Sequence, residues 1–406
     1  MMMASVWRMN SSQASARTDA ARLVAVRAAG AAAVGLIDEV WDAGDAALPL
    51  DPGLPVATAR RIAADLGASA LIEPGDRRTL SHGTEAVLPA GTALVVRTSG
   101  TTAAPRGVVL SRAALRAGVE ASIDRLDARS GARWLAVLPV HHVAGLLVVL
   151  RARVAGTTPI VHPRFDAARV AAETSATHVA LVPTMLHRLL EHDADVRRFH
   201  RILLGGAATS DDLRARATAA GARLTISYGM TETAGGCVYD GRPLDGVSVA
   251  VEPDGRVLLR GDVLANGYLV DGRVVPLTDE DGWFRTGDVG TFADGRLVVH
   301  GRADDVIVSG GVNVSTTAVA EILHDHPRVA DAAVVGVPDD EWGEVAVALV
   351  VPSDPDAPPS LADLRDHVGA HGDRAAAPRR LRVVSALPRT AMGKIDRRAL
   401  RAAAEA

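Results

Sequence analysis

The sequence predicts a mixed α/β fold with a large N-terminal domain of α/β layers that includes a small β-barrel-like part, and a small α+β domain behind it. In the first half of the chain, apolar runs of strand length alternate with stretches of helical spacing. From about Val247 this pattern changes to short strands separated by Gly-Asp turns, and beyond Asp305 a new α+β pattern begins. Together these observations indicate at least two domains.

The elements of the first half follow in a regular order. We expect helices in 57–66, 111–126, 182–192 and 210–221, and strands in 69–73, 91–98, 133–140, 200–205 and 222–229. Such βα alternation is typical of stacked layers around largely parallel sheets. The apolar run at 141–154 is too short to cross a bilayer.

The second half is richer in strands. Residues 247–262, 267–275 and 290–301 each contain two short strands around a Gly-containing turn, which predicts a small antiparallel barrel or sheet. Helices are then expected in 316–327 and 360–372, and strands in 329–339 and 344–352. The change of pattern at 301–305 divides the chain into domains 21–302 and 303–406, preceded by a disordered N-terminus, 1–20.

The composition limits the classes of partner. The chain has 406 residues, of which 48% are hydrophobic and 23% charged, as in a folded globular protein. Its net charge of −4 provides no basic field for nucleic acid or an anionic membrane. The single cysteine, Cys237, excludes an internal disulfide and a cysteine-rich zinc site. The apolar stretch near the N-terminus contains Arg22 and Arg27, so we expect a cytoplasmic protein without membrane insertion.

Two short motifs could bind a nucleotide. The loop "TSGTTAAPRG" (98–107) follows a strand and gathers hydroxyls and backbone N–H groups that can surround phosphate oxygens, although it lacks the Walker A spacing. In "SYGMTET" (227–233), Tyr228 could stack on a purine and Glu232 could hold Mg²⁺. Alone, the first motif is more often a plain turn and the second a strand end with an N-capping threonine. Asp288 could likewise bind ribose hydroxyls or cap a turn.

Five motifs together carry a resemblance to a known family. "TSGTTAAPRGVVLS", "SYGMTET", "GWFRTGDVG", "GRADDVIVSGG" and "PRTAMGKIDRRAL" resemble, in order, the core motifs of the AMP-forming acyl-CoA synthetase and adenylation superfamily. The resemblance extends from about residue 40 to the C-terminus. Within the superfamily, the stretches 138–145 and 177–190 are most similar to actinobacterial o-succinylbenzoate-CoA ligases of menaquinone biosynthesis.

The resemblance implies a reaction in two steps. A carboxylate attacks the α-phosphate of ATP–Mg²⁺ and forms an acyl-adenylate and pyrophosphate, and the thiol of coenzyme A then displaces AMP. The substrates would be a small carboxylic acid, ATP and CoA. The resemblance also implies a C-terminal lid domain that is mobile between the two steps, and it allows a homodimer.

The resemblance implies a role for residues at matching positions. Thr98, Ser99, Gly100, Thr101, Thr102 and Arg106 would surround the β- and γ-phosphates; Gly206, Ala207, Ala208, Tyr228 and Gly229 the adenine; Asp288 and Arg302 the ribose; Thr231 the α-phosphate; Glu232 the Mg²⁺; His142 the acyl group; and Ser309, Gly310 and Gly311 the pantetheine arm. Asp304 would be the hinge. Lys394, Thr231, Glu232 and Arg106 would be the catalytic residues.

Some residues depart from the family pattern or need a second interpretation. Ala103 stands where the family usually has glycine, and Arg106 where it has lysine, so the geometry of the phosphate contacts can differ. His141 and His142 are expected at a strand end, where adjacent side chains point to opposite sides, so we expect one pocket-lining and one structural histidine and not a shared metal. Cys237 is expected to be a small apolar filler near the substrate pocket.

Lys394 is a lysine in a chain that uses arginine at its other Lys and Arg positions. The chain contains 44 lysine and arginine residues, and Lys394 is the single lysine among them. A compact ammonium can follow charge that moves between oxygens better than a planar guanidinium, which favours a catalytic role over a chance surface position.

Three functions remain open at this point. The first is an acid–CoA ligase, with o-succinylbenzoate preferred over a short fatty or aryl acid. The second is an adenylating enzyme that loads a carrier protein, and the third is a nucleotide-binding protein without activity, suggested by Ala103 and Arg106. ATP–pyrophosphate exchange separates the third from the others, and the choice of acceptor separates the first two.

Overall fold

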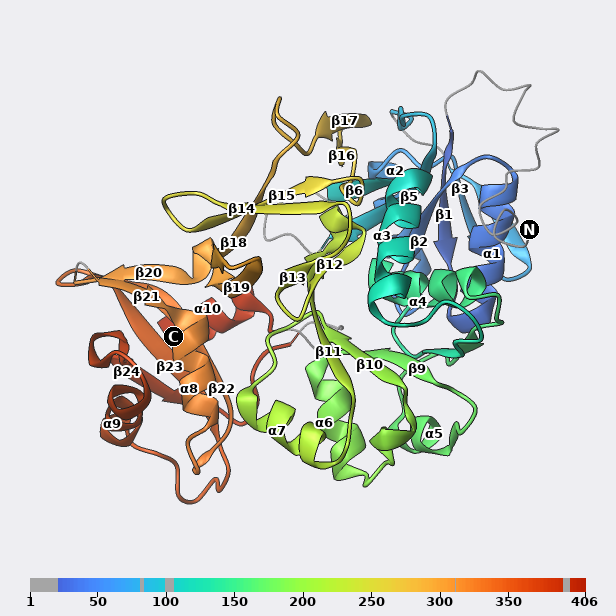
Figure 1. Ribbon diagram of the computed structural model, residues 1–406. Helices are drawn as coiled ribbons and strands as arrows, with labels where there is room; N and C mark the ends of the chain where they lie inside the picture. The colour runs from blue at the N-terminus through green and yellow to red at the C-terminus, as the bar shows by residue number, and fades with distance from the viewer. Residues whose placement is uncertain (1–20, 81–83, 99–105, 311, 390–394) are drawn as a thin grey trace. The chain divides into compact units, whose positions relative to one another are not determined.

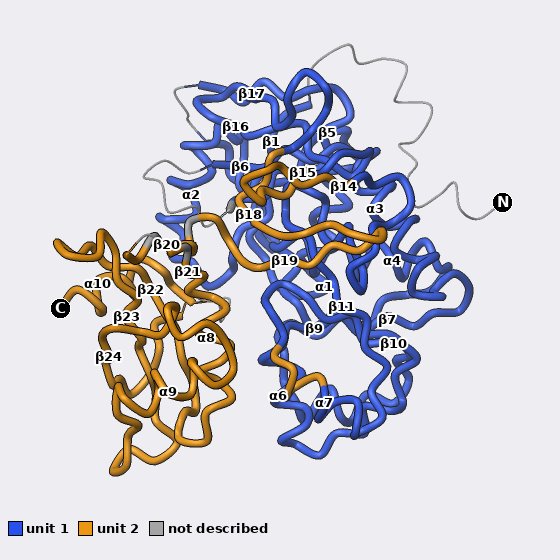
Figure 2. The backbone as a smooth tube through the Cα atoms, turned by 60° about the vertical axis from the view of Figure 1, so that its left-hand side comes forward, with its two compact units in different colours: residues 1–209, 215–248, 259–284 blue, residues 210–214, 249–258, 285–406 orange. Residues whose placement is uncertain are grey.

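The computed structural model describes residues 21–80, 84–98, 106–310, 312–389 and 395–406 (Figure 1). The backbone forms two compact units, coloured separately in Figure 2. Unit 1 consists of residues 1–209, 215–248 and 259–284, and unit 2 of residues 210–214, 249–258 and 285–406. The N-terminal segment 1–20, which we expect to be disordered, lies outside the described residues.

Unit 1 contains an eight-stranded sheet. In spatial order its strands are β17 (Arg273–Pro276), β16 (Gly267–Val270), β6 (Arg106–Ser111), β5 (Thr92–Thr98), β2 (Ala46–Leu50), β1 (Leu23–Arg27), β3 (Ala70–Glu73) and β4 (Asp76–Thr79). Strands β3, β1, β2 and β5 are parallel, whereas β4, β6, β16 and β17 pair antiparallel. The expected parallel arrangement therefore covers half of this sheet, because short connections such as β3–β4 can join only antiparallel neighbours.

A second sheet of seven strands begins at β7. Its spatial order is β13 (Arg242–Pro243), β12 (Gly235–Tyr239), β11 (Leu224–Met230), β10 (Arg201–Gly205), β9 (His178–Leu181), β7 (Trp134–Ala136) and β8 (Ile160–Val161). The five strands from β11 to β8 are parallel, as the βα alternation predicts. The intervening helical elements are α5 (Ala167–Ala172), α6 (Pro183–Glu191), η1 (Val196–Arg198) and α7 (Asp211–Ala219).

Helix α4 (Val143–Val154) packs against both of these sheets. Leu146, Leu147 and Leu150 belong to the apolar cluster formed with the eight-stranded sheet, α1 (Gly30–Asp42) and α3 (Arg112–Arg125). Val148 and Val149 belong to the cluster formed with the seven-stranded sheet. This double burial explains a helix that is apolar on all sides. The opposite face of the eight-stranded sheet is covered by α2 (Val56–Asp65).

Helix α4 contains two arginines, of which Arg153 pairs with Asp38 and Arg151 is buried in the apolar surface. Arg151 is only 2% exposed, and its Nε donates to Ser122 Oγ of α3 at 2.5 Å. Its Nη2 donates to Tyr239 Oη of β12 at 3.3 Å, and its Cζ lies 5.5 Å from the centre of the Trp134 ring. Arg151 therefore connects α4 with α3, β12 and β7. Among the helices of the described part of the chain, none is both long and apolar enough to cross a membrane.

The strand-rich segment after Val247 forms an antiparallel sheet. Its order is β14 (Val247–Val251), β15 (Arg256–Gly261), β18 (Phe284–Ala293) and β19 (Arg296–Arg302). Of the two predicted arrangements, barrel or sheet, this segment has the sheet. The hairpin β16–β17 has the same local pattern but extends the eight-stranded sheet by pairing with β6.

The C-terminal part of unit 2 has an α+β arrangement, as predicted. Its elements are η3 (Ala303–Asp305), β20 (Val306–Ser309), β21 (Val312–Ser315), α8 (Thr316–His324), β22 (Val329–Asp339), β23 (Gly343–Pro352), α9 (Leu361–His371), η4 (Arg374–Ala376), β24 (Arg380–Val383) and α10 (Arg397–Glu405). The sheet has the order β21–β20–β23–β22, with β24 also paired to β23. Helices α8 and α9 share one apolar cluster with this sheet and α10 shares another.

Candidate active site

The predicted phosphate loop is closed by two paired strands of unit 1. Thr98, the last residue of β5, pairs with Arg106, the first residue of β6. The side chain of Arg106 is exposed, so it can reach a ligand near this end of the hairpin. The loop residues Ser99, Gly100, Thr101 and Thr102, together with Ala103, lie outside the described residues.

The residues predicted to surround adenine lie at the carboxyl ends of two neighbouring strands. Gly205 of β10 is aligned with Ser227 of β11 in a parallel pair, so Gly206 and Tyr228 follow at the same edge of the sheet. Gly206 has φ +82°, a value that favours glycine, and Ala207 and Ala208 are exposed beside it. Ligands of open α/β sheets bind at this edge. The structure therefore brings this predicted group together.

The turn η2 (Thr231–Thr233) contains one structural threonine. Thr233 is fully buried; its Oγ1 accepts from the Met230 N–H at 2.9 Å and donates to the Gly235 carbonyl at 2.6 Å. The predicted N-capping threonine is therefore wrong in position: the N-cap residue is Met230, and Thr233, the third residue of the turn, accepts from its N–H. Thr231 and Glu232 remain half-buried and precede it in the same turn.

Glu232 is held by residues of the segment before and within β16. Tyr268 Oη donates to Glu232 Oε1 at 2.8 Å, and the Ala265 N–H donates to the Glu232 carbonyl at 2.8 Å. No described group of three or more His, Cys, Asp or Glu side chains is arranged to hold a metal ion. Mg²⁺ is commonly held by one or two carboxylates plus substrate phosphates, so Glu232 fits this kind of site.

The two adjacent histidines do not point to opposite sides. The ring centroids of His141 and His142 are 4.2 Å apart, with a tilt of 54° between the rings. The prediction assumed a strand end, but these residues form the turn before α4, in which the His142 N–H donates to the Pro139 carbonyl at 3.1 Å. A turn removes the strict alternation of a strand. Burial lowers the pKa of His141, which favours its neutral form.

Cys237 lies in β12 and is fully buried. Burial raises the pKa of its thiol to about 12, so the group stays protonated and unreactive. This agrees with the expected filler role.

The predicted ribose residues face each other across one hairpin of unit 2. Asp288 of β18 is aligned with Arg302 of β19, and Arg302 Nη1 lies 3.6 Å from Asp288 Oδ1. Asp288 is 8% exposed. This pair places a carboxylate acceptor and a guanidinium donor side by side, as binding of ribose hydroxyls requires.

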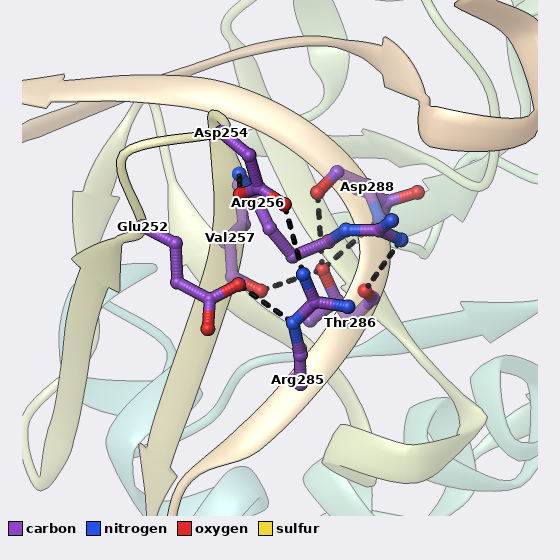
Figure 3. Close-up of polar contacts among 7 residues, drawn as sticks. All are labelled: Glu252, Asp254, Arg256, Val257, Arg285, Thr286 and Asp288. Carbon is purple, nitrogen blue, oxygen red and sulfur yellow. Dashed lines mark hydrogen bonds and ion pairs between the residues drawn. The ribbon is translucent and has the colours of Figure 1, made fainter.

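Thr286 holds the backbone at Asp288. Its Oγ1 accepts from the Asp288 N–H at 3.1 Å and donates to the Val257 carbonyl of β15 at 2.8 Å (Figure 3). Arg256 Nη1 donates to the Thr286 carbonyl at 3.3 Å. These polar contacts with β15 fix the part of strand β18 that carries the Asp288 carboxylate.

Arg285 extends the same network toward the surface. Its Nε donates to Glu252 Oε2 at 2.6 Å and its Nη2 to Asp254 Oδ2 at 2.9 Å, as Figure 3 shows. Arg285 is half exposed, and exposed ion pairs contribute little to stability. Its two carboxylate partners hold the β14–β15 turn against β18.

Gly287 allows the approach of Arg302 to Asp288. A Cβ added at Gly287 would lie 2.3 Å from Arg302 Nη2 and 2.8 Å from its Cζ. We expect Gly287→Ala to displace the guanidinium and to weaken AMP binding about tenfold, the effect of losing one charged hydrogen bond. Calorimetric titration with AMP measures this effect, with Gly35→Ala as the control because its added methyl meets nothing within 4 Å. An AMP affinity within twofold of the parent would contradict the role given to Gly287.

The predicted hinge and pantetheine residues follow β19. Asp304 lies in the short turn η3, and Ser309 is buried in β20. Gly310 has φ +57°, and a Cβ there would lie 2.5 Å from the Trp342 ring, over which Arg379 packs. Gly311 lies outside the described residues.

Lys394 also lies outside the described residues, but both flanks of its loop are described. Arg389 and Ile395 form an antiparallel bridge, and the Asp396 N–H donates to the Pro388 carbonyl at 2.9 Å. Asp396 then caps α10 by accepting from the Ala399 N–H at 3.1 Å. The described residues on the two sides of 390–394 are therefore paired with each other.

Arg397 connects this loop base to the turn that contains the predicted hinge. Its Nη2 donates to a carboxylate oxygen of Asp305, which also accepts from Thr317 Oγ1 at 3.4 Å. Burial raises the pKa of Asp305, and the Arg397 guanidinium opposes that shift.

Sequence reasoning missed the supporting residues Tyr268, Thr286, Gly287 and Arg397. Tyr268 could have been noticed because it is one of three tyrosines in a chain with 3% aromatic residues. Thr286 and Gly287 stand in the quoted motif "GWFRTGDVG" beside Asp288, but only the aspartate was given a role.

Comparison with known proteins determines the family. The AMP-binding enzyme family model matches residues 76–269, and the AMP-binding enzyme C-terminal domain model matches residues 318–394. A probable 2-succinylbenzoate–CoA ligase of Mycobacterium tuberculosis is 41% identical over 322 residues, covering 76% of this chain and 83% of the relative. The chain belongs to the AMP-binding enzyme family.

Two further relatives of this AMP-binding enzyme extend the comparison. A 2-succinylbenzoate–CoA ligase of Listeria monocytogenes is 31% identical over 76% of this chain and 69% of its own length. The o-succinylbenzoate–CoA synthetase of Bacillus subtilis, solved with an acyl-adenylate intermediate, superimposes with a TM-score of 0.81 at 26% identity, covering 98% and 90% of the two chains. The predicted superfamily and the mixed α/β fold are confirmed, and the chain is an AMP-binding enzyme.

Proposed function

We propose that this AMP-binding enzyme is an ATP-dependent o-succinylbenzoate–CoA ligase of menaquinone biosynthesis. The observation that carries the proposal is the 41% identity to the Mycobacterium tuberculosis ligase across 83% of that protein. Each unit supports the proposal by itself. In unit 1, the Tyr228 edge of the seven-stranded sheet and the turn at Glu232 supply groups that suit adenine and a metal-bound phosphate. In unit 2, the Asp288–Arg302 pair supplies an acceptor and a donor that suit ribose hydroxyls.

In the first half-reaction, the acid's carboxylate attacks the α-phosphate of ATP and releases pyrophosphate. Both reactants are anions, so the protein has to supply positive charge and aligned donors where charge develops. Arg106 at the end of the phosphate hairpin and Thr231 in η2 take this role in unit 1. Lys394 bridges the carboxylate and α-phosphate oxygens as the new P–O bond forms.

Glu232 would hold Mg²⁺, which, when bound, neutralises the phosphate oxygens of ATP. Tyr228 and the segment Gly206–Ala208, with Gly229 beside it, bind adenine. Asp288 accepts the ribose hydroxyls while Arg302 donates beside it. These contacts orient the α-phosphate for attack.

In the second half-reaction the thiol of coenzyme A attacks the acyl carbonyl and AMP leaves. We place a domain boundary between residues 302 and 303, so that the domain 303–406 turns about Asp304 after adenylation. Ser309 and Gly310, with Gly311 after them, would border the pantetheine arm. His142 would line the acyl pocket.

An acid panel tests the substrate. AMP release that depends on both ATP and CoA should be fastest with o-succinylbenzoate and slower with medium-chain fatty acids and simple aryl acids. Turnover of a medium-chain fatty acid at an equal or higher kcat/KM would refute the substrate, although it would leave the adenylating chemistry intact.

The acceptor and the chemistry are tested separately. ATP–pyrophosphate exchange that depends on the acid excludes a nucleotide-binding protein without activity. Thioester formation with free CoA, and none with a phosphopantetheine carrier protein, excludes carrier loading. The proposal places the reaction in the cytoplasm, and light scattering tests the homodimer that the resemblance allows.

A further inference from the structure

Tyr268 donates a side-chain hydrogen bond to the carboxylate of Glu232. Its phenolic oxygen lies 2.8 Å from Glu232 Oε1, within the normal range for an O–H donor. Both side chains are partly buried. An ionised carboxylate has about four lone-pair sites, so this bond leaves the carboxylate able to accept a further partner.

The backbone around Tyr268 fixes the position of its ring. In β16, Tyr268 is aligned with Val108 of β6, two residues after Arg106 at the end of the predicted phosphate loop. The Asn266 N–H donates to the Val109 carbonyl at 2.9 Å, and the Ala265 N–H donates to the Glu232 carbonyl at 2.8 Å. Segment 265–268 therefore joins the strand of the phosphate loop to the turn of Glu232, within unit 1.

The chemistry of the donor suits a metal-binding carboxylate. A phenol is neutral near pH 7, so it orients the carboxylate without cancelling the negative charge that attracts a cation. An arginine or lysine in the same place would compete with the cation for that charge. Mg²⁺ requires near-octahedral geometry with short oxygen distances, so a ligand that rotates freely binds it less tightly.

We propose that Tyr268 is a positioning residue that holds the Glu232 carboxylate so that Oε2 faces the Mg²⁺ of bound ATP. This inference rests on the proposed function, because it takes Glu232 as a ligand of the ATP metal. Tyr268 itself does not touch ATP in this account. It acts through Glu232, as hydrogen-bonding partners of metal-ligating carboxylates generally do.

Direct measurement of metal binding tests the proposal. Mn²⁺ is titrated by electron paramagnetic resonance into the full chain saturated with α,β-methylene ATP, whose α–β bridge cannot be cleaved, so that no acyl-adenylate forms. Tyr268→Phe removes only the hydroxyl, and it should weaken Mn²⁺ binding on the order of tenfold, as loss of a partner to a metal ligand typically does. Binding of AMP without metal should be unchanged.

Two further variants complete the experiment. Glu232→Gln should weaken Mn²⁺ binding at least as much as Tyr268→Phe. Tyr239→Phe is the matched control, since it removes a phenol that contacts Arg151 at 3.3 Å in the core and should leave the Mn²⁺ affinity unchanged. Thermal unfolding of each variant identifies a general loss of structure.

The outcomes separate the possibilities. A Tyr268→Phe affinity for Mn²⁺ within twofold of the parent overturns the proposal and leaves a purely structural contact. Equal weakening in Tyr239→Phe overturns it too, because the effect would then be general. An unchanged Glu232→Gln affinity overturns both the proposal and the assignment of Glu232 as a ligand. None of these results depends on the acid, so failure of the ligase function is detected separately by the acid panel.

Discussion

Replacement of Lys394 by alanine is expected to slow ATP–pyrophosphate exchange by roughly 10²–10³-fold, the loss of about 3–4 kcal/mol of transition-state stabilisation. The ammonium would be the group that follows charge from the carboxylate to the α-phosphate oxygens, and no neighbouring lysine can replace it, because the chain has only this one. Lys394→Arg should lose less, since it keeps the charge but not the compact shape.

An exposed arginine that follows Lys394 in the sequence provides the control for Lys394→Ala. Arg398 is exposed in α10, four residues after Lys394, so Arg398→Ala tests whether any lost cation in this segment slows the reaction. Thioester formation from supplied acyl-adenylate and CoA should remain near normal in Lys394→Ala. An exchange rate within about twofold of the parent would refute the catalytic role of the lysine.

Asp304→Pro is expected to separate the two half-reactions. Asp304 lies in the 3₁₀ turn η3, whose typical φ of about −50 to −70° accommodates the fixed φ of proline. The substitution should therefore fix this turn without unfolding it. We expect acid-dependent ATP–pyrophosphate exchange to survive, and thioester formation to fall on the order of 10²-fold, the cost of small misplacements of reacting groups.

The side chain and the backbone are distinguished by a second variant. Asp304→Ala removes the carboxylate but leaves φ unrestricted, so it should retain far more thioester formation than Asp304→Pro. Single-turnover measurements of each half-reaction provide the comparison. An equal loss of both half-reactions in Asp304→Pro would indicate that this turn has a structural role and is not a hinge.

Local sequence patterns predicted most helices and strands, but they did not predict which strands pair with one another. Helical spacing identified α7, which has an exposed side, and apolar runs of strand length identified β10 and β11. Helix α4 was not identified as a helix, because burial against two sheets makes it apolar all round and removes the period. The hairpins β16–β17 and β18–β19 look alike locally, yet they join different sheets, because strand pairing depends on distant residues such as those of β6.

The candidate site also divides into residues that sequence motifs identify and contacts that depend on long-range pairing. The resemblance placed Glu232, Asp288 and Arg302 in motifs of the family, and the roles given to them stay predictions. The contact of Tyr268 with Glu232 could not be predicted, because 36 residues separate them and the register of β16 on β6 brings them together. The close approach of the Arg302 guanidinium to Gly287 likewise appears only when the Arg302 side chain is in place.

The burial of α4 against two sheets has a consequence for how unit 1 unfolds. Its side chains complete the apolar clusters of both large sheets, so separation of either sheet exposes part of the other core. Opening of one sheet therefore costs contacts in both, which couples them into one cooperative unit of unfolding. Fluctuations of low free energy are then confined to the connections at the strand ends, including the turn at His142.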